Sequence, residues 1–251
     1  MKTIVVLSSP RSGSSLIAGV LDCLGVFIGS KGDLVKRGYL NKFGCYENQD
    51  FLRYNLNVLA MSDAIPGYKP PSSDSLKRVV GKTCVWVVDL IKKNECSLWG
   101  WKDPSTIYSL PYFHEQLINP YYVYIKRDLR AVLKSHFRTS KKRVLIKTIK
   151  SYNQLFTKKN LLRLVIKYLR AMIKWGDFTQ REDLIKANLR DQVRRIKCFI
   201  KNKHSITISF ERLINEPGFE IDRLINFLGI EPTRKQERDA LRFVRPEEVH
   251  C

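Results

Sequence analysis

A short loop near the start of the chain holds residues suited to binding an anion. Its sequence is Ser8-Ser9-Pro10-Arg11-Ser12-Gly13-Ser14-Ser15. Between a strand and a helix, successive backbone N–H groups can converge on a phosphate or sulfate, and the helix dipole adds attraction. The hydroxyls of Ser14 and Ser15 can donate, and the Arg11 guanidinium is a planar, charged fork. The loop therefore predicts a phosphate-binding site; an ordinary serine-rich turn is the alternative.

The loop differs from the P-loop of nucleotide triphosphatases. That P-loop has two glycines separated by four residues, and the second is followed by Lys and Ser or Thr. Here Gly13 is the one glycine, and the loop has no lysine. An ordinary ATPase or GTPase is disfavoured. A small-molecule kinase is kept as an alternative function, and it would need carboxylates that bind magnesium.

The elements that must position this loop follow a regular order. Four short runs typical of strands alternate with helical patterns, at residues 3–7, 98–101, 121–125 and 205–209. Strands that alternate with helices pair in parallel and are covered on both faces. We therefore expect an α/β fold, a three-layer sandwich with a central parallel sheet flanked by helices. A chain of 251 residues can form it as a single domain, residues 1–251.

Two predicted helix starts place polar residues beside strand ends. Asp128 can cap a helix that carries Ser135 about two turns further on. Asp103, followed by Pro104, is typical of a second helix start.

Positive charge is concentrated in one part of the chain. The net charge is +21, and residues 134–203 contain 21 basic and 4 acidic residues. We interpret residues 140–203 as a basic helical insertion within the domain. One helix in it has apolar residues on one face and basic residues on another: Leu162, Val165, Ile166, Leu169 and Ile173 against Arg163, Lys167, Arg170 and Lys174. We expect the apolar face to cover the sheet and the lysines to be solvated. A noncatalytic protein that binds a polyanion or a membrane surface is the alternative.

Metal binding and secretion are both disfavoured by the sequence. The six cysteines are widely spaced, without a CxxC pair, so neither a metal site nor a disulfide framework is expected. The first apolar run is too short for a signal sequence, and no stretch is long enough to span a membrane. We expect a cytoplasmic location.

Two segments resemble the nucleotide-binding motifs of one enzyme family. Residues 10–15 resemble the 5′-phosphosulfate loop of sulfotransferases that use 3′-phosphoadenosine 5′-phosphosulfate (PAPS), in the subgroup with arginine at Arg11. Residues 122–127, with Ser135 eight residues beyond Arg127, resemble the family's 3′-phosphate motif. The resemblance implies that Pro10 through Ser15 bind the 5′-phosphosulfate and that Arg127 and Ser135 bind the 3′-phosphate.

Two further segments are similar to bacterial-type and tyrosylprotein-type sulfotransferases. These are residues 99–104 and residues 208–213, the latter followed by residues 227–229. Together the matches imply a P-loop-type sandwich that transfers the sulfuryl group of PAPS to a hydroxyl and releases adenosine 3′,5′-bisphosphate. A nucleotide donor and a hydroxylated acceptor, not a nucleic acid, are then the expected partners. A carbohydrate is the acceptor that we favour, and the positive charge of the chain would suit an acidic glycan, while tyrosine, lipid and phenol stay open.

The catalytic residues that the resemblance implies differ from those of cytosolic sulfotransferases. Those enzymes use a histidine base in a Lys-Thr-His segment, which this chain lacks. Glu47 lies in a segment that resembles the position of a glutamate base, although it could simply favour a helix N-terminus. Arg11 is the expected stabiliser of the leaving phosphate. Lys102, at a strand end, is a second candidate cation; an ordinary surface lysine is its alternative.

Overall fold

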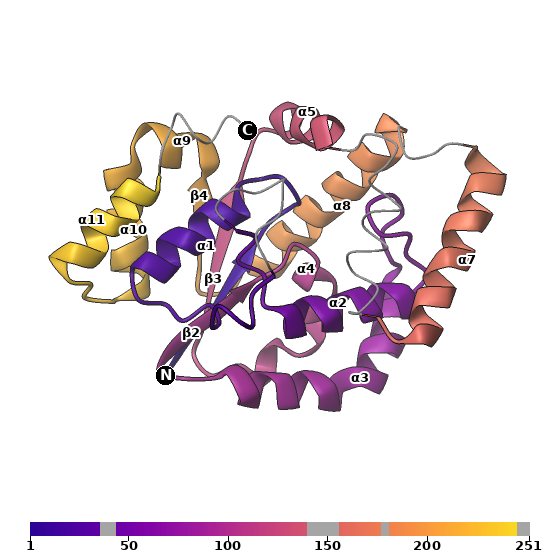
Figure 1. Ribbon diagram of the computed structural model, residues 1–251, viewed down its shortest axis with the longest axis horizontal. Coiled ribbons are helices and arrows are strands. Elements are labelled where there is room, and N and C mark those ends of the chain that lie inside the picture. The colour runs from indigo at the N-terminus through magenta and orange to yellow at the C-terminus, as the bar shows by residue number, and fades with distance from the viewer. Residues whose placement is uncertain (36–43, 140–155, 177–180, 245–251) are drawn as a thin grey trace.

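The computed structural model describes residues 1–35, 44–139, 156–176 and 181–244. Its centre is a parallel sheet of β1 (Lys2–Leu7), β2 (Leu98–Lys102), β3 (Pro120–Lys126) and β4 (Ser205–Ser209), in the order β2-β1-β3-β4 (Figure 1). These are the four strands that the sequence predicted, each within one residue at either end. Because all four run in the same direction, their carboxyl ends meet at one edge of the sheet, where the residues predicted to bind a ligand follow.

Helices cover both faces of the sheet. Those that contribute most are α1 (Ser14–Cys23), α2 (Gln49–Met61), α3 (Ser73–Asn94), α4 (Thr106–Ser109), α8 (Glu182–Ile200), α9 (Phe210–Asn215), α10 (Pro217–Leu228) and α11 (Arg234–Phe243). Successive strand residues point to opposite faces. Val5 and Trp101 therefore pack with α2, α3, α4 and α8, whereas Ile4 and Val123 pack with α1, α9, α10 and α11. The predicted three-layer sandwich is confirmed.

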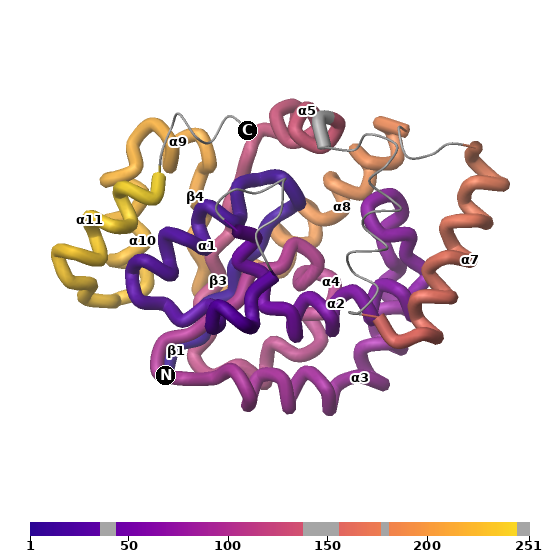
Figure 2. Tube along the Cα trace, viewed as in Figure 1, coloured from indigo at the N-terminus to yellow at the C-terminus, as the bar shows by residue number. Residues whose placement is uncertain are grey.

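The remaining elements lie at the margins of these layers. They are α5 (Leu129–Thr139), α7 (Lys158–Trp175) and two short 3₁₀ turns, η1 (Leu110–Tyr112) and η2 (His114–Gln116). In Figure 2 the indigo α1 lies beside the yellow α11, so the first and last helices of the described chain are packed together. Within the described ranges, no helix is long and apolar enough to cross a bilayer.

The basic segment is helical where the structure describes it, but the orientation predicted for α7 was wrong. Residues 140–155 and 177–180 lie outside the described residues. Helix α7 packs on α2 rather than on the sheet and buries Leu164, Tyr168 and Ala171. Leu162 and Ile173, expected to be covered, are exposed. Lys167, expected in solvent, is directed inward toward the end of α2.

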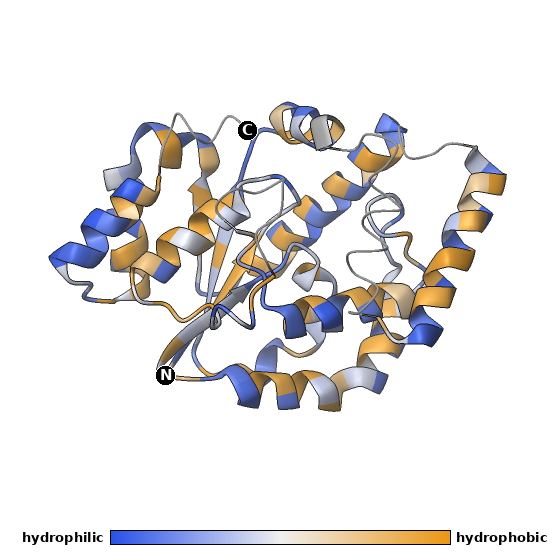
Figure 3. Ribbon diagram, viewed as in Figure 1, coloured by the Kyte–Doolittle hydropathy of each residue, from blue (hydrophilic) through white to orange (hydrophobic). Residues whose placement is uncertain are grey.

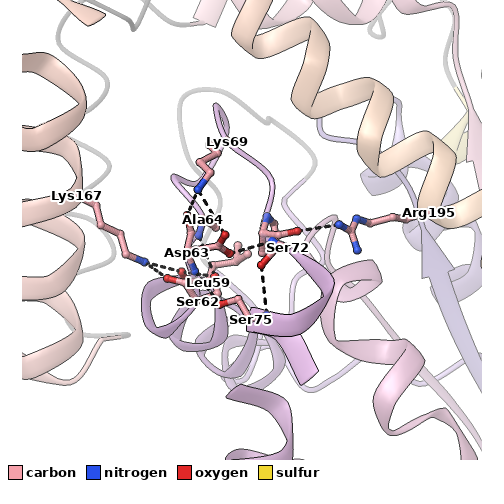
Figure 4. Close-up of polar contacts among 10 residues, drawn as sticks. Leu59, Ser62, Asp63, Ala64, Lys69, Ser72, Ser75, Lys167 and Arg195 are labelled. Atoms are coloured by element: carbon pink, nitrogen blue, oxygen red, sulfur yellow. Dashed lines mark hydrogen bonds and ion pairs between the residues drawn. The ribbon is translucent and has the colours of Figure 1, made fainter. Parts of the chain in front are cut away.

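The reason for this orientation is a set of hydrogen bonds between Lys167 and the end of α2 (Figure 4). The Lys167 ammonium donates to the carbonyls of Leu59, Ala60 and Ser62, at 3.2, 2.7 and 2.5 Å. The last carbonyls of a helix have no partner within it, so a cation there satisfies them and meets the negative end of the dipole. Burial lowers the pKa of Lys167 to about 8, opposed by the nearby Asp63, so the side chain is still mainly protonated at neutral pH.

Candidate active site

The loop after β1 turns sharply before α1 begins. Arg11 and Gly13 have positive φ angles, +65° and +90°, and the first bonds of α1 return to the Gly13 carbonyl. A Cβ atom on Gly13 would lie 2.2 Å from the ring of Phe210, which follows β4. Glycine is therefore required here both for the backbone angle and for the close approach of Phe210. The first-turn N–H groups of α1 lie at this end of the sheet, as a phosphate site needs.

Two arginines meet beside this loop. The Arg11 Nε donates to the Ser135 hydroxyl at 3.1 Å, and an Arg127 terminal nitrogen donates to the Arg11 carbonyl at 3.2 Å. Burial is the main cause that lowers the pKa of each guanidinium. For Arg127 the charge of Glu211 opposes this effect on the pKa and the charge of Arg11 adds to it. Each guanidinium is thus partly withdrawn from water, and an anion bound beside both would compensate for the lost solvation.

Arg127 is held in place by an aromatic ring. Its guanidinium lies over Phe210, 4.1 Å from the ring centre, which is a favourable cation–π distance. Its Nε is buried without a hydrogen-bond partner, as is the hydroxyl of Ser8 at the end of β1. Buried polar groups almost always have a partner. These two donors therefore indicate a site prepared for a polar ligand.

A buried ion pair lies at the end of the neighbouring strand. The Lys102 ammonium is 2.8 Å from Glu47 Oε1, and the two side chains are 2% and 15% exposed. Lys102 is the last residue of β2, and Glu47 precedes Asn48, the residue whose side chain caps α2. The alternative of a surface lysine is thus wrong. Glu47 lies near the start of a helix, and it also has a specific cationic partner in Lys102.

Stacked aromatic rings hold β2 in position. Trp101 stacks on Phe51 of α2 with centroids 4.3 Å apart and planes 5° from parallel, and Trp99 lies 5.6 Å from Trp101. On the other face, a Cβ at Gly100 would lie 2.1 Å from the Ile4 carbonyl oxygen. Bulky packing on one face and close strand contact on the other therefore fix the position from which Lys102 extends.

Asp103 is a buried carboxyl that the sequence did not single out as a site residue. It accepts hydrogen bonds from the Asn55 amide at 2.7 Å and from the Ser105 N–H at 2.9 Å, and Asn55 also bonds to Thr106 and Ser109. Helix α4 begins at Thr106, two residues after Pro104. Asp103 thus joins β2 to α2 and α4 behind the ion pair.

The loop after β1 is connected to the Glu47–Lys102 pair by a hydrogen bond, and charges from both act on the Cys45 thiol. The Ser15 hydroxyl donates to the Cys45 carbonyl at 3.1 Å, and the Ser12 hydroxyl bonds within the loop to the Ser9 carbonyl. Burial, and next the charge of Glu47, raise the pKa of the Cys45 thiol, whereas Lys102 and Arg11 lower it. The cations proposed from the sequence therefore lie near one another around residues 44–47, at the carboxyl edge of the sheet.

The structure brings the predicted residues together in two groups. Arg11, Arg127 and Ser135 form one group, and Glu47 and Lys102 form the other. Sequence reasoning missed Phe210, Asp103 and Asn55. Two of these lie directly after a strand, at the edge where ligands of such sheets bind, which was a usable signal. No cluster of three or more His, Cys, Asp or Glu residues that could hold a metal occurs among the described residues.

The pH dependence of folding should reveal the buried state of Asp103. Burial, with a smaller contribution from Glu47, raises the pKa of Asp103 from 3.8 to about 7. Between these values the folded protein holds a proton that the unfolded chain has lost. The free energy of unfolding should therefore fall as pH rises through this window, by up to about 1.4 kcal/mol per pH unit from this residue. We expect Asp103→Asn to lack this component.

Urea unfolding of both proteins across this window measures the difference directly. The stability of Asp103→Asn relative to the native chain should improve as pH rises toward about 7. Curves that stay parallel would mean that Asp103 does not titrate there.

Comparisons with known proteins identify the family of the chain. The family model for the sulfotransferase domain matches residues 104–245, which include Arg127, Ser135 and Phe210 but not the loop after β1. A solved structure described as "Sulfotransferase Domain from the Curacin Biosynthetic Pathway" aligns with 93% of this chain and 75% of its own length, at 16% identity and a TM-score of 0.49. A search of curated proteins found no match. Because the family model covers more than half of the sequence, the chain belongs to the sulfotransferase domain family.

Proposed function

We propose that this protein transfers the sulfuryl group of PAPS to a hydroxyl group of an acceptor, releasing adenosine 3′,5′-bisphosphate. The observation that carries the proposal is the pair of neighbouring arginines, Arg11 and Arg127, beside the N-terminus of α1. Two guanidiniums from neighbouring strand ends, one of them with a buried Nε that lacks a partner, fit a ligand with more than one negative group. PAPS has a phosphosulfate and a separate 3′-phosphate.

In this proposal the two ends of the nucleotide have different partners. Arg127 and Ser135 bind the 3′-phosphate, with the Phe210 ring holding the guanidinium in place. Residues 10–15 surround the 5′-phosphosulfate through backbone N–H groups. The Ser12 and Ser15 hydroxyls donate to the Ser9 and Cys45 carbonyls and so hold the shape of the loop. Arg11 bonds to Ser135 here, and we expect it to contact the 5′-phosphate when the donor binds. It then stabilises the charge that develops on the leaving phosphate.

The Glu47–Lys102 pair supplies the acid–base and electrostatic part of the mechanism. Glu47 accepts the acceptor's hydroxyl proton while that oxygen forms its bond to sulfur and the bond from sulfur to the phosphate oxygen breaks. Lys102 directs its charge toward the phosphate oxygen that leaves. Lys102 bonds to Glu47 here, and we expect it to turn toward the donor when PAPS binds, which leaves the carboxylate oxygen free to accept the proton.

A thermal-shift titration with adenosine 3′,5′-bisphosphate tests the donor site. At about 100 times its dissociation constant a ligand adds roughly 2.7 kcal/mol of stability, which should raise Tm by several degrees in a chain of this length. We expect this rise in the native chain and its loss in Arg127→Ala. A matched control is Arg181→Ala, because Arg181 is 47% exposed and pairs only at the surface with Asp183. The control should keep the full shift.

ADP, and ATP with magnesium, complete the experiment. A shift with ATP and magnesium, without one from the bisphosphate, would favour a kinase. No shift in Tm with any of the three nucleotides would favour a noncatalytic binding protein. Equal shifts in Arg127→Ala and the native chain would show that the bisphosphate binds elsewhere.

For the acceptor we propose a carbohydrate hydroxyl. The excess positive charge of the chain suits an acidic glycan, because it raises the local concentration of anions. Transfer of label from radiolabelled PAPS to a panel of neutral and acidic sugars, tyrosine peptides and phenols identifies the class. Labelling of phenols alone would overturn this choice while leaving sulfuryl transfer intact.

A further inference from the structure

Helix α7 packs against the rest of the described structure along one side. Asn160, Leu164, Tyr168 and Ala171 are buried on that side. The Asn160 amide bonds to Asn57 at 2.8 Å, and the Tyr168 hydroxyl bonds to the Pro66 carbonyl at 2.9 Å. With Lys167 bound at the end of α2 (Figure 4), these bonds fix the rotation of the helix about its axis.

The opposite side of α7 is apolar and exposed. We call it the outward stripe, and it consists of Leu162, Ile166, Leu169, Met172 and Ile173. Leu162 is 60% exposed and Ile173 is 87% exposed. Most of these residues recur three or four apart, so they form a line along the helix. Figure 3 shows orange and blue residues alternating along α7, at the margin of the molecule. A contiguous apolar face of this kind usually marks an interaction surface.

The charges of α7 are of one sign. The helix contains six lysines and arginines and no acidic residue. At 3.6 residues per turn, Lys159, Arg163, Arg170 and Lys174 lie along one flank of the outward stripe, between it and the buried side. All four are exposed. Long basic side chains can keep their charge in water while their stems lie along an apolar surface.

We propose that α7 binds the surface of an anionic membrane, lying flat with the outward stripe among the lipid chains and its basic flank at the headgroups. A second copy of the chain is disfavoured as the occupant, because two such helices would bring like charges together. A soluble polyanion would use the charges but leave the stripe in water. An anionic lipid surface satisfies both features, and amphipathic helices that bind in this way combine them. The proposal is independent of the donor and acceptor proposed above.

Vesicle flotation of the chain, residues 1–251, tests this surface. We expect binding to phosphatidylcholine vesicles that contain phosphatidylserine, and little binding to phosphatidylcholine alone. Leu169→Gln with Ile173→Gln should weaken the binding at least about tenfold, because two apolar side chains no longer enter the lipid. Lys159→Gln with Arg170→Gln should weaken the dependence on phosphatidylserine and on salt. These positions are exposed, so Tm should change little.

The matched control removes apolar surface elsewhere. Val85→Gln with Ile118→Gln alters residues that are 72% and 52% exposed and lie outside α7, and this variant should bind vesicles as the native chain does. Absence of binding to either kind of vesicle, or unchanged binding by the stripe variant, would overturn the proposal. A dimer in analytical ultracentrifugation that the stripe variant abolishes would instead assign the stripe to a second copy. A stripe covered by residues 140–155 would give a lower Tm in the stripe variant and no vesicle binding in the native chain.

Discussion

Replacing Glu47 by glutamine should lower kcat for sulfuryl transfer by about 10²- to 10⁴-fold, the usual contribution of a general base. The amide keeps the size of the carboxyl but cannot accept the proton of the acceptor hydroxyl. The measurement is the single-turnover rate with radiolabelled PAPS. Binding of adenosine 3′,5′-bisphosphate, followed by thermal shift, should be unchanged, because Glu47 contacts Lys102 and not the arginine group. The loss of rate is thereby separated from loss of the donor site.

A second carboxylate at the start of α2 provides the control. Asp50 also pairs with a lysine, Lys93, at 2.5 Å, but that lysine is 65% exposed. Asp50→Asn should therefore keep a rate close to that of the native chain. A rate for Glu47→Gln within a few-fold of the native value would remove Glu47 as the base. His136 would then be the next residue to test, because burial and the charge of Arg11 lower its pKa and it follows Ser135 in sequence.

Loss of the two arginines around Glu220 should be the most destabilising change away from the site. The Glu220 carboxylate is fully buried in α10, 3.2 Å from Arg212 and 2.6 Å from Arg223. Replacing both arginines by glutamine leaves a desolvated charge without a partner. We expect this to cost about 3–5 kcal/mol in the free energy of unfolding, measured by urea denaturation.

The same prediction has an internal test in a triple variant. Adding Glu220→Gln to the double variant removes the unpaired charge and should recover part of the lost stability. Arg53→Gln with Arg181→Gln is the control, since both arginines pair at the surface, and it should cost less than about 1 kcal/mol. A triple variant no more stable than the double one would mean that the arginines act through packing on Phe219, which both guanidiniums face.

Much of the fold could be predicted from local patterns. The four strands are short, β-branched or aromatic runs with clear ends, and burial on both faces makes such runs distinctive. Asp128 caps α5 as expected, accepting from the Ala131 N–H at 2.9 Å. These features depend on neighbours in sequence, so the sequence contains the information needed to find them.

The orientation of α7 could not be predicted in the same way. Its most apolar residues are in the outward stripe, so a prediction from hydropathy alone places that side toward the protein interior. The side that is buried contains Asn160 and Lys167, whose partners are the Asn57 amide and the carbonyls at the end of α2, about a hundred residues earlier. Tertiary hydrogen bonds of this kind outweigh the local pattern, and nothing local to α7 encodes them.

For the candidate site, the sequence predicts a set of residues but not how they pair with one another. Parallel strand ends predict that Arg11, Lys102 and Arg127 gather at one edge. The contact between Arg11 and Ser135 and the ion pair between Glu47 and Lys102 depend on how α5 and residues 44–48 approach that edge. The burial of Asp103 likewise depends on Asn55 from α2.

The position of β1 inside the sheet affects how the chain can fold during synthesis. β1 pairs with β2 and β3, whose first residues in the register are Leu98 and Pro120. At ordinary translation speeds the ribosome needs roughly 5–20 s to add the residues between β1 and the end of β2. For that time a β-branched strand has both edges open to other chains. A nascent chain of this protein should therefore depend on chaperones until β2 emerges, and truncated products that end before β2 should aggregate.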